Sequence, residues 1–101
     1  MQQPNMKMIQ QMQQRLMKAQ EELGNEVVEG TAGGGAVTIK MNGHKQVQSV
    51  KIDPAAVDPA DVETLEEMIL SAIGDASAKA EQLAAQRMGA LTGGLKIPGL
   101  M

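Results

Sequence analysis

A β-hairpin pattern between residues 36 and 52 constrains the fold of this chain more than any other feature. Ala36–Met41 alternates apolar with polar or charged residues, and Val47–Ile52 is a second strand candidate. Asn42-Gly43 follows the first of these segments and is among the strongest short-range signals for a hairpin turn. Asp53-Pro54 ends the second strand, because proline lacks a backbone donor. Glu26–Thr31 is a weaker candidate for a third strand, so we predict an antiparallel sheet.

The loop length of this hairpin decides which side chains share a face of the sheet. A loop of two or four residues puts the apolar residues of both strands on one face, formed by Val37, Ile39, Val50 and Ile52. A loop of three residues would turn the second strand over, since side chains alternate between faces. With the apolar face inward, Lys40 and Lys51 share the outer face.

A helix is predicted on the N-terminal side of the sheet, over Asn5–Leu23. Its apolar residues recur at alternating spacings of three and four, which is typical of a coiled-coil seam. This seam consists of Ile9, Met12, Leu16, Ala19 and Leu23. We expect Gly24 to end the helix in a left-handed conformation. At 1.5 Å per residue the helix is about 30 Å long, so it should project beyond the sheet.

A second helix is predicted after the sheet, with Asp58 as its N-cap and Pro59 at its first position. Its apolar stripe narrows to alanine in the middle and includes Gly74. Small residues there indicate close approach of the sheet or of another helix. The helix should end between Met88 and Leu91.

The core of this chain must be built without aromatic residues, because the 101 residues include no Phe, Tyr or Trp. Each aromatic side chain buries about 150–250 Å², and chains of this size are marginally stable even with a good core. We therefore expect a homodimer. Cysteine is also absent, which excludes disulfides, thiol nucleophiles and cysteine-based metal sites. We expect a soluble, cytoplasmic protein, since no signal-peptide or membrane-span pattern is found.

Charge is segregated along the chain, although the net charge is −3. Residues 2–20 and 36–51 contain basic residues and no acidic ones. Residues 53–75 hold seven acidic residues and no basic one. A basic surface is therefore possible on an acidic protein.

Five basic residues on the two helices are candidates for contact with DNA phosphates: Lys7, Arg15, Lys18, Lys79 and Arg87. Arg15 and Lys18 are three residues apart and share a helix face, with Lys7 two turns earlier. A charged helix face that is merely solvated is the competing interpretation. Without aromatic residues, the common mode of single-strand binding by base stacking is disfavoured.

Other polar or distinctive groups have simpler explanations. His44 is interpreted as an exposed turn residue. The acidic run from Asp58 to Glu67 complements the positive end of a helix. Gly33-Gly34-Gly35 is a flexible turn, because no lysine and hydroxyl residue follow it as in a phosphate-binding loop. Methionines crowd the first helix and are expected to pack in its seam. No set of residues suggests an enzyme, a cofactor, a metal or a small-molecule substrate.

Taken together, these segments resemble the YbaB/EbfC family of nucleoid-associated proteins. The resemblance extends from about Met6 to Pro98. It rests on Gln20-Glu21-Glu22-Leu23 at the end of a Gln/Met-rich helix, on Val37–Gly43, and on Val50–Pro54 before an acidic helix. The order and spacing of these pieces carry the resemblance, since no single piece is specific.

The resemblance implies an α+β fold of helix, three-stranded antiparallel sheet and helix, forming a homodimer with projecting helical arms. It implies sequence-tolerant binding of double-stranded DNA and a role in nucleoid organisation and gene regulation. Arg15, Lys18 and Arg87 fall where family members carry basic residues, and Lys7 and Lys79 are further candidates. We expect one domain over residues 1–91 and a mobile tail over residues 92–101. The alternative function is a dimeric protein-interaction module that does not bind DNA.

Overall fold

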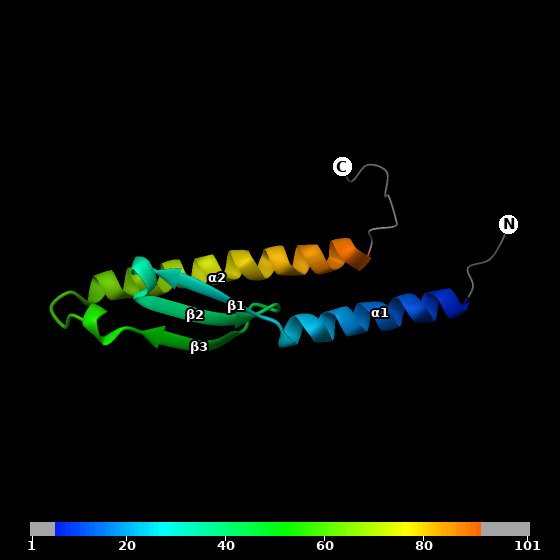
Figure 1. Cartoon of the computed structure of the whole chain (residues 1–101), viewed down its shortest axis with the longest axis horizontal. Coiled ribbons are helices and arrows are strands. Elements are labelled where there is room, and N and C mark those ends of the chain that lie inside the picture. The colour runs from blue at the N-terminus through cyan, green and yellow to red at the C-terminus, as the bar shows by residue number, and fades with distance from the viewer. Residues whose placement is uncertain (1–5, 92–101) are drawn as a thin grey trace.

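The computed structural model describes residues 6–91 and has the predicted order of helix, three strands and helix (Figure 1). The elements are α1 (Met6–Asn25), β1 (Val27–Ala32), β2 (Val37–Asn42), β3 (Val47–Ile52) and α2 (Val62–Leu91). Short 3₁₀ turns at Gly33–Gly35 and Pro54–Ala56 join them. The α+β prediction is confirmed. The predicted tail at residues 92–101 lies outside the described residues.

The three strands form one antiparallel sheet in the order β1-β2-β3. Residues 43–46 separate β2 from β3, and the ladder beside this turn pairs Met41 with Val47. A bulge beside Lys40 and Met41 then shifts the register, so that Ile39 lies opposite Val50 and Val37 opposite Ile52. The prediction that Val37, Ile39, Val50 and Ile52 lie on one face of the sheet is therefore confirmed. It depends on a bulge that the turn sequence did not reveal.

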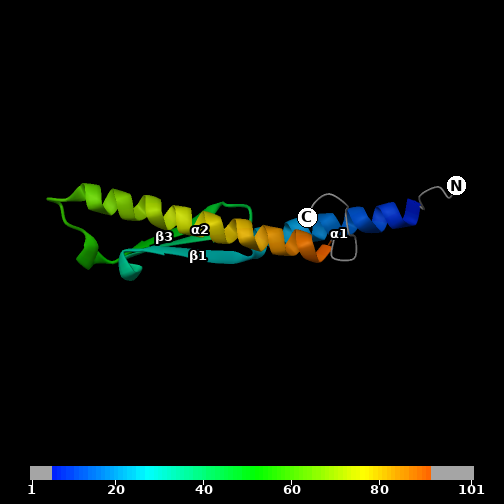
Figure 2. The same cartoon turned by 90° about the horizontal axis from the view of Figure 1, so that it is seen from above.

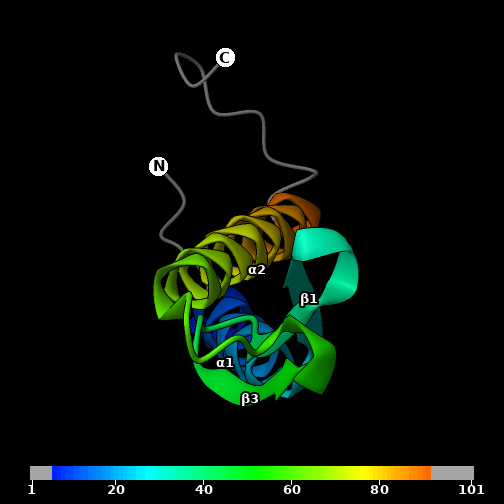
Figure 3. The same cartoon turned by 90° about the vertical axis from the view of Figure 1, so that its left-hand side faces the viewer.

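The core lies between α2 and the two strands β1 and β2, with α2 on one face of the sheet (Figure 3). Its fully buried members are Val37, Ile39, Met41, Ala72, Ala76 and Ala80. The alanines let α2 approach β1 so closely that Gly30 has no room for a side chain. A Cβ there would lie 2.2 Å from the carbonyl oxygen of Ala72. The small residues of α2 therefore allow its close approach to the sheet, one of the two predicted possibilities. Gly74 takes no part in this contact, because it faces open space.

The start of α2 differs from the prediction. The helix begins at Val62, so Asp58 is not its N-cap and Pro59 is not its first residue. Asp58 instead accepts a hydrogen bond from the amide of Ala60 (2.9 Å) in a turn. Asp61 is the capping residue, with one carboxylate oxygen 3.3 Å from the amide nitrogen of Thr64. Aspartate side chains bind nearby amides in turns as readily as at helix ends, which explains the displacement.

The end of α1 also differs from the prediction. The helix continues to Asn25, and Gly24 lacks the positive φ expected of a left-handed cap. The β2–β3 turn caps the helix instead. The amide of Gly43 donates to the carbonyl of Leu23 (2.9 Å), and the Asn42 side chain donates to the carbonyl of Gly24 (3.3 Å). The unpaired carbonyls at the helix end are therefore satisfied by a distant part of the chain.

Both helices extend beyond the sheet, as their lengths predicted (Figures 1 and 2). Most of α1 projects away from the strands, and the C-terminal half of α2 extends toward the same end. Of the predicted seam, Ala19 and Leu23 are buried near the sheet. Ile9, Met12 and Leu16 are 43–51% exposed on the projecting part. The chain alone thus leaves an apolar helix face uncovered.

Candidate nucleic-acid interface

The projecting part of α1 carries the three N-terminal basic candidates, Lys7, Arg15 and Lys18, all of them exposed. At about 100° per residue, Lys7 and Lys18 lie on the side of the helix away from the seam formed by Ile9, Met12, Leu16, Ala19 and Leu23, and Arg15 flanks the seam. Neither Arg15 nor Lys18 forms an ion pair with any residue between 6 and 91. Their charges are therefore available to a negatively charged partner.

The two basic candidates on α2 are held by other groups. Lys79 donates to the backbone carbonyl of Glu29 (2.8 Å), and its ammonium lies 3.3 Å from the carboxylate of Asp75. Asp75 also accepts from the amide of Thr31 (3.0 Å). This bond and the adjacent Lys79 lower the pKa of Asp75 below its ordinary value of 3.8. Asp75 and Lys79 together bind backbone groups of the edge strand β1.

Arg87 forms a two-point ion pair with Glu26, which lies between α1 and β1. Its Nε is 3.1 Å from one carboxylate oxygen, and a terminal nitrogen contacts the other. The Glu26 hydrogen bonds and charge raise the pKa of Arg87 above its ordinary value. Paired carboxylate and guanidinium groups of this kind have a fixed mutual geometry. Arg87 thus ties α2 to the base of α1.

His44 helps to fix the direction of α1. It is exposed on the β2–β3 turn, as predicted, and its Nε2 lies 2.8 Å from the carbonyl oxygen of Gln20. Sequence reasoning did not identify this contact, because the two residues are 24 positions apart. With the bonds from Asn42 and Gly43, the turn contacts three carbonyl groups in the last turns of the helix. The arm that carries Arg15 and Lys18 is therefore braced by the sheet.

The acidic run Asp58–Glu67 lies at the opposite end of the molecule from the arm (Figure 1). Within residues 6–91, no group of three or more His, Cys, Asp or Glu side chains is placed to hold a metal ion. The glycine turn Gly33–Gly35 has positive φ at all three residues and does not begin a helix. No helix in the described part of the chain is long and apolar enough to cross a membrane.

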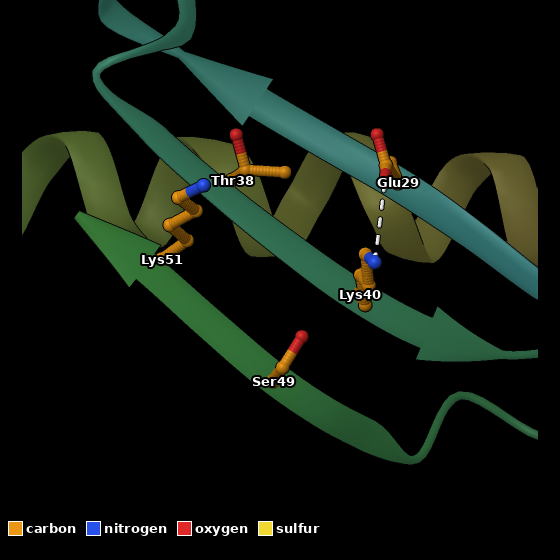
Figure 4. Close-up of a pocket in the computed structure, with 5 residues that line it drawn as sticks. All are labelled: Glu29, Thr38, Lys40, Ser49 and Lys51. Atoms are coloured by element: carbon orange, nitrogen blue, oxygen red, sulfur yellow. Dashed lines mark ion pairs between the residues drawn. The ribbon is translucent and has the colours of Figure 1, made fainter. Parts of the chain in front are cut away.

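The outer face of the sheet forms a second polar surface, opposite the face covered by α2 (Figure 4). A shallow hollow of about 430 Å³ there is lined by Glu29, Thr38, Lys40, Ser49 and Lys51. The sequence had placed Lys40 and Lys51 on one face, and the register confirms this. These two lysines were not among the candidate DNA contacts identified from the sequence.

Comparison with known proteins agrees with this architecture. The model of the YbaB/EbfC DNA-binding family matches residues 1–95. A protein of Chloroflexus aurantiacus named nucleoid-associated protein is 63% identical over 91 residues, covering 90% of this chain and 91% of that protein. A Pelotomaculum thermopropionicum protein of the same name is 55% identical, covering 94% and 90% of the two chains.

A solved structure shows the same fold at lower sequence identity. An uncharacterized protein from Helicobacter pylori superposes with a TM-score of 0.70 at 20% identity. The match covers 88% of this chain and 90% of that one. This likeness supports the arrangement of α1, the sheet and α2.

Proposed function

Because this chain belongs to the YbaB/EbfC DNA-binding family, we propose that it binds double-stranded DNA with little sequence preference, through phosphate contacts made by α1. The observation that carries the proposal is the basic side of the projecting helix, where Arg15 and Lys18 are exposed and lack acidic partners within the described chain. Phosphate contacts supply affinity without reading the base sequence.

Lys7 belongs to the same helix side and is proposed as a further contact. Lys79 and Arg87 are proposed as secondary contacts, because each must leave or share an intramolecular partner before it binds a phosphate. Their replacement is therefore expected to weaken DNA binding less than replacement of Arg15 and Lys18. The names of the relatives support a location in the nucleoid and a role in its organisation.

We also propose that the protein acts as a homodimer. We assign two of the uncovered apolar surfaces, the α1 seam and the strand β3, to the dimer contact; other exposed apolar residues, Val57, Val62 and Leu70, lie around the start of α2. Val50 lies opposite the fully buried Ile39, yet it is 51% exposed because α2 covers β1 and β2. The other sheet edge, β1, is already bound by Asp75 and Lys79. A second copy that covers β3 and the seam would bury these groups and double the DNA contacts.

The DNA proposal is tested by fluorescence anisotropy with two labelled duplexes of unrelated sequence. We expect binding that falls steeply between about 50 and 200 mM salt. The double variant Arg15→Gln/Lys18→Gln should reduce the slope of log K against log salt by about 1.8 per protomer, since each lost phosphate contact removes about 0.9. Lys45→Gln is the charge control, because Lys45, on the β2–β3 turn, is already paired with Glu81 of α2.

Two results would count against this proposal. A double variant that binds like the Lys45→Gln control would show that α1 does not contact the duplex. A loss confined to one of the two duplexes would show base recognition instead of phosphate contact.

The dimer is tested by sedimentation velocity on Leu16→Glu and Val50→Glu. Each substitution places a charge on one of the two uncovered apolar surfaces, so each should shift the protein toward monomer and weaken DNA binding. A dimer unaffected by both variants would contradict the assignment of these surfaces. The alternative function, a protein-interaction module that uses the same α1 seam, would be favoured by dimer formation without any DNA binding at about 50 mM salt.

A further inference from the structure

The outer face of the sheet carries two lysines and two hydroxyl groups in a regular arrangement. Strand pairing sets Lys51 opposite Thr38 and Lys40 opposite Ser49 (Figure 4). The two lysines are therefore diagonal neighbours, with backbones about 7–8 Å apart. In each of these two pairs, a lysine thus lies directly across from a hydroxyl residue on the same face. Lysine, serine and threonine are among the residues that contact DNA phosphates.

The charges on this face are only weakly compensated by the protein itself. Lys51 forms no ion pair with any residue that the structure describes. Lys40 lies 3.8 Å from the carboxylate of Glu29, and both side chains are more than half exposed. Exposed pairs of this kind contribute little stability. Asp53, which follows β3, accepts a hydrogen bond from the amide of Ala55 (3.0 Å).

The composition of the face distinguishes between possible partners. The hollow is lined by Glu29, Thr38, Lys40, Ser49 and Lys51, so it contains no aromatic or large aliphatic side chain. Protein–protein interfaces are centred on such apolar groups and are depleted in lysine. A polyanion with regularly spaced charges suits two lysines and two hydroxyls better. The duplex that α1 is proposed to bind is such a polyanion.

We propose that the outer face of the sheet is a second phosphate-contact surface, on which Lys40 and Lys51 bind the backbone of the DNA duplex. This inference rests on the proposed function, because duplex DNA is its occupant. If the dimer joins through β3, the Lys51 residues of both copies lie near the two-fold axis, and the two faces form one basic strip. Glu29 is the opposing charge on that strip and limits the affinity.

The test uses three variants of the full chain, Lys51→Gln, Lys40→Gln and Glu29→Gln, with Lys45→Gln as control. Anisotropy with a random-sequence duplex is measured at several salt concentrations. Each lysine variant should lose about eightfold in affinity at 0.1 M salt per contact removed, with a slope reduced by about 0.9. Glu29→Gln should bind more tightly than wild type, because it removes the negative charge beside Lys40. A purely structural role of these residues would not produce this opposite sign.

The outcomes separate this inference from the proposed function. Normal binding by Lys40→Gln and Lys51→Gln, together with weakened binding by Arg15→Gln/Lys18→Gln, would overturn the sheet surface and leave the arm proposal standing. Absence of wild-type binding would overturn both. Thermal melts of each variant, monitored by circular dichroism, show that the fold is retained. A loss of affinity in a variant that melts like wild type supports the proposal.

Discussion

The packing of α2 on β1 predicts opposite stability effects for the same substitution at two glycines. At Gly30, a new Cβ would lie 2.2 Å from the Ala72 carbonyl oxygen and 2.3 Å from the Ala76 backbone nitrogen. These are backbone atoms, so relief requires α2 to move away from the strand. At Gly74, on the same helix, a new Cβ would meet nothing within 4 Å. Gly30→Ala should therefore destabilise the protein, and Gly74→Ala should stabilise it.

The magnitudes follow from the two environments. Overpacking in a tight core costs typically about 1–3 kcal/mol, and the backbone contacts of Gly30 place this variant at the upper end, about 3 kcal/mol. Replacing an unhindered helical glycine with alanine gains about 1 kcal/mol. For a domain of this size, 1 kcal/mol shifts Tm by about 4–8 °C. We expect a Tm about 12–24 °C lower for Gly30→Ala and about 4–8 °C higher for Gly74→Ala.

The assay is thermal unfolding followed by circular dichroism at 222 nm, complemented by urea titration at one fixed protein concentration. The fixed concentration matters because a dimer has a concentration-dependent Tm. A Gly30→Ala variant as stable as wild type would refute the close approach of α2 to β1. A destabilised Gly74→Ala would show that its open surface is covered in the assembled protein.

Two further predictions concern contacts that join distant parts of the chain. The lowered pKa of Asp75 means that its stabilising contribution is present above pH 3.8 and is lost as the pH falls through the lowered value. Asp75→Asn should therefore melt below wild type at neutral pH, and the difference should vanish in acid; an equal difference at both pH values would contradict this. His44→Ala removes a contact with the Gln20 carbonyl worth about 1 kcal/mol. It should speed amide exchange at the end of α1 relative to a Lys45→Ala control, and unchanged exchange would contradict the bracing role.

The parts of the fold that were predicted correctly depend on local sequence patterns. Alternation of side chains located β2, the Asn42-Gly43 turn signal placed β3 as its return strand, and the alanine stripe of α2 indicated a close approach. Three aspartates in the turns around residues 53–61 show where a local pattern did not locate the start of a helix. Asp53, Asp58 and Asp61 each accept a hydrogen bond from a backbone amide two or three residues later. All three satisfy the local rule for a helix cap, so sequence alone did not show that only Asp61 begins α2.

The basic residues of the candidate interface were also only partly predictable from local sequence. Arg15 and Lys18 could be identified because residues 2–20 contain no acidic residue, although Glu21 and Glu22 follow Lys18 at helical pairing distance. Lys79 and Arg87 gave an equally basic signal, and of their partners only Asp75, four residues before Lys79, follows from helical spacing. The Glu29 carbonyl that Lys79 binds and the Glu26 carboxylate that Arg87 binds lie 50 and 61 positions away. Contacts at that separation are made only by the folded chain. The sequence therefore located the basic residues and could not rank them.

The folded arrangement explains how a protein with a net charge of −3 can present a basic surface. The carboxylates of Glu26, Glu29, Asp75 and Glu81 each lie beside a basic side chain within the chain. The acidic start of α2 lies at the end of the molecule remote from the arm. The potential at the projecting part of α1 is therefore set mainly by residues of α1 itself, the basic Lys7, Arg15 and Lys18 with Glu21 and Glu22 after them, since exposed charges are screened beyond about 10 Å at 0.1 M salt. Local placement of charge, more than the net value, decides which face a polyanion approaches.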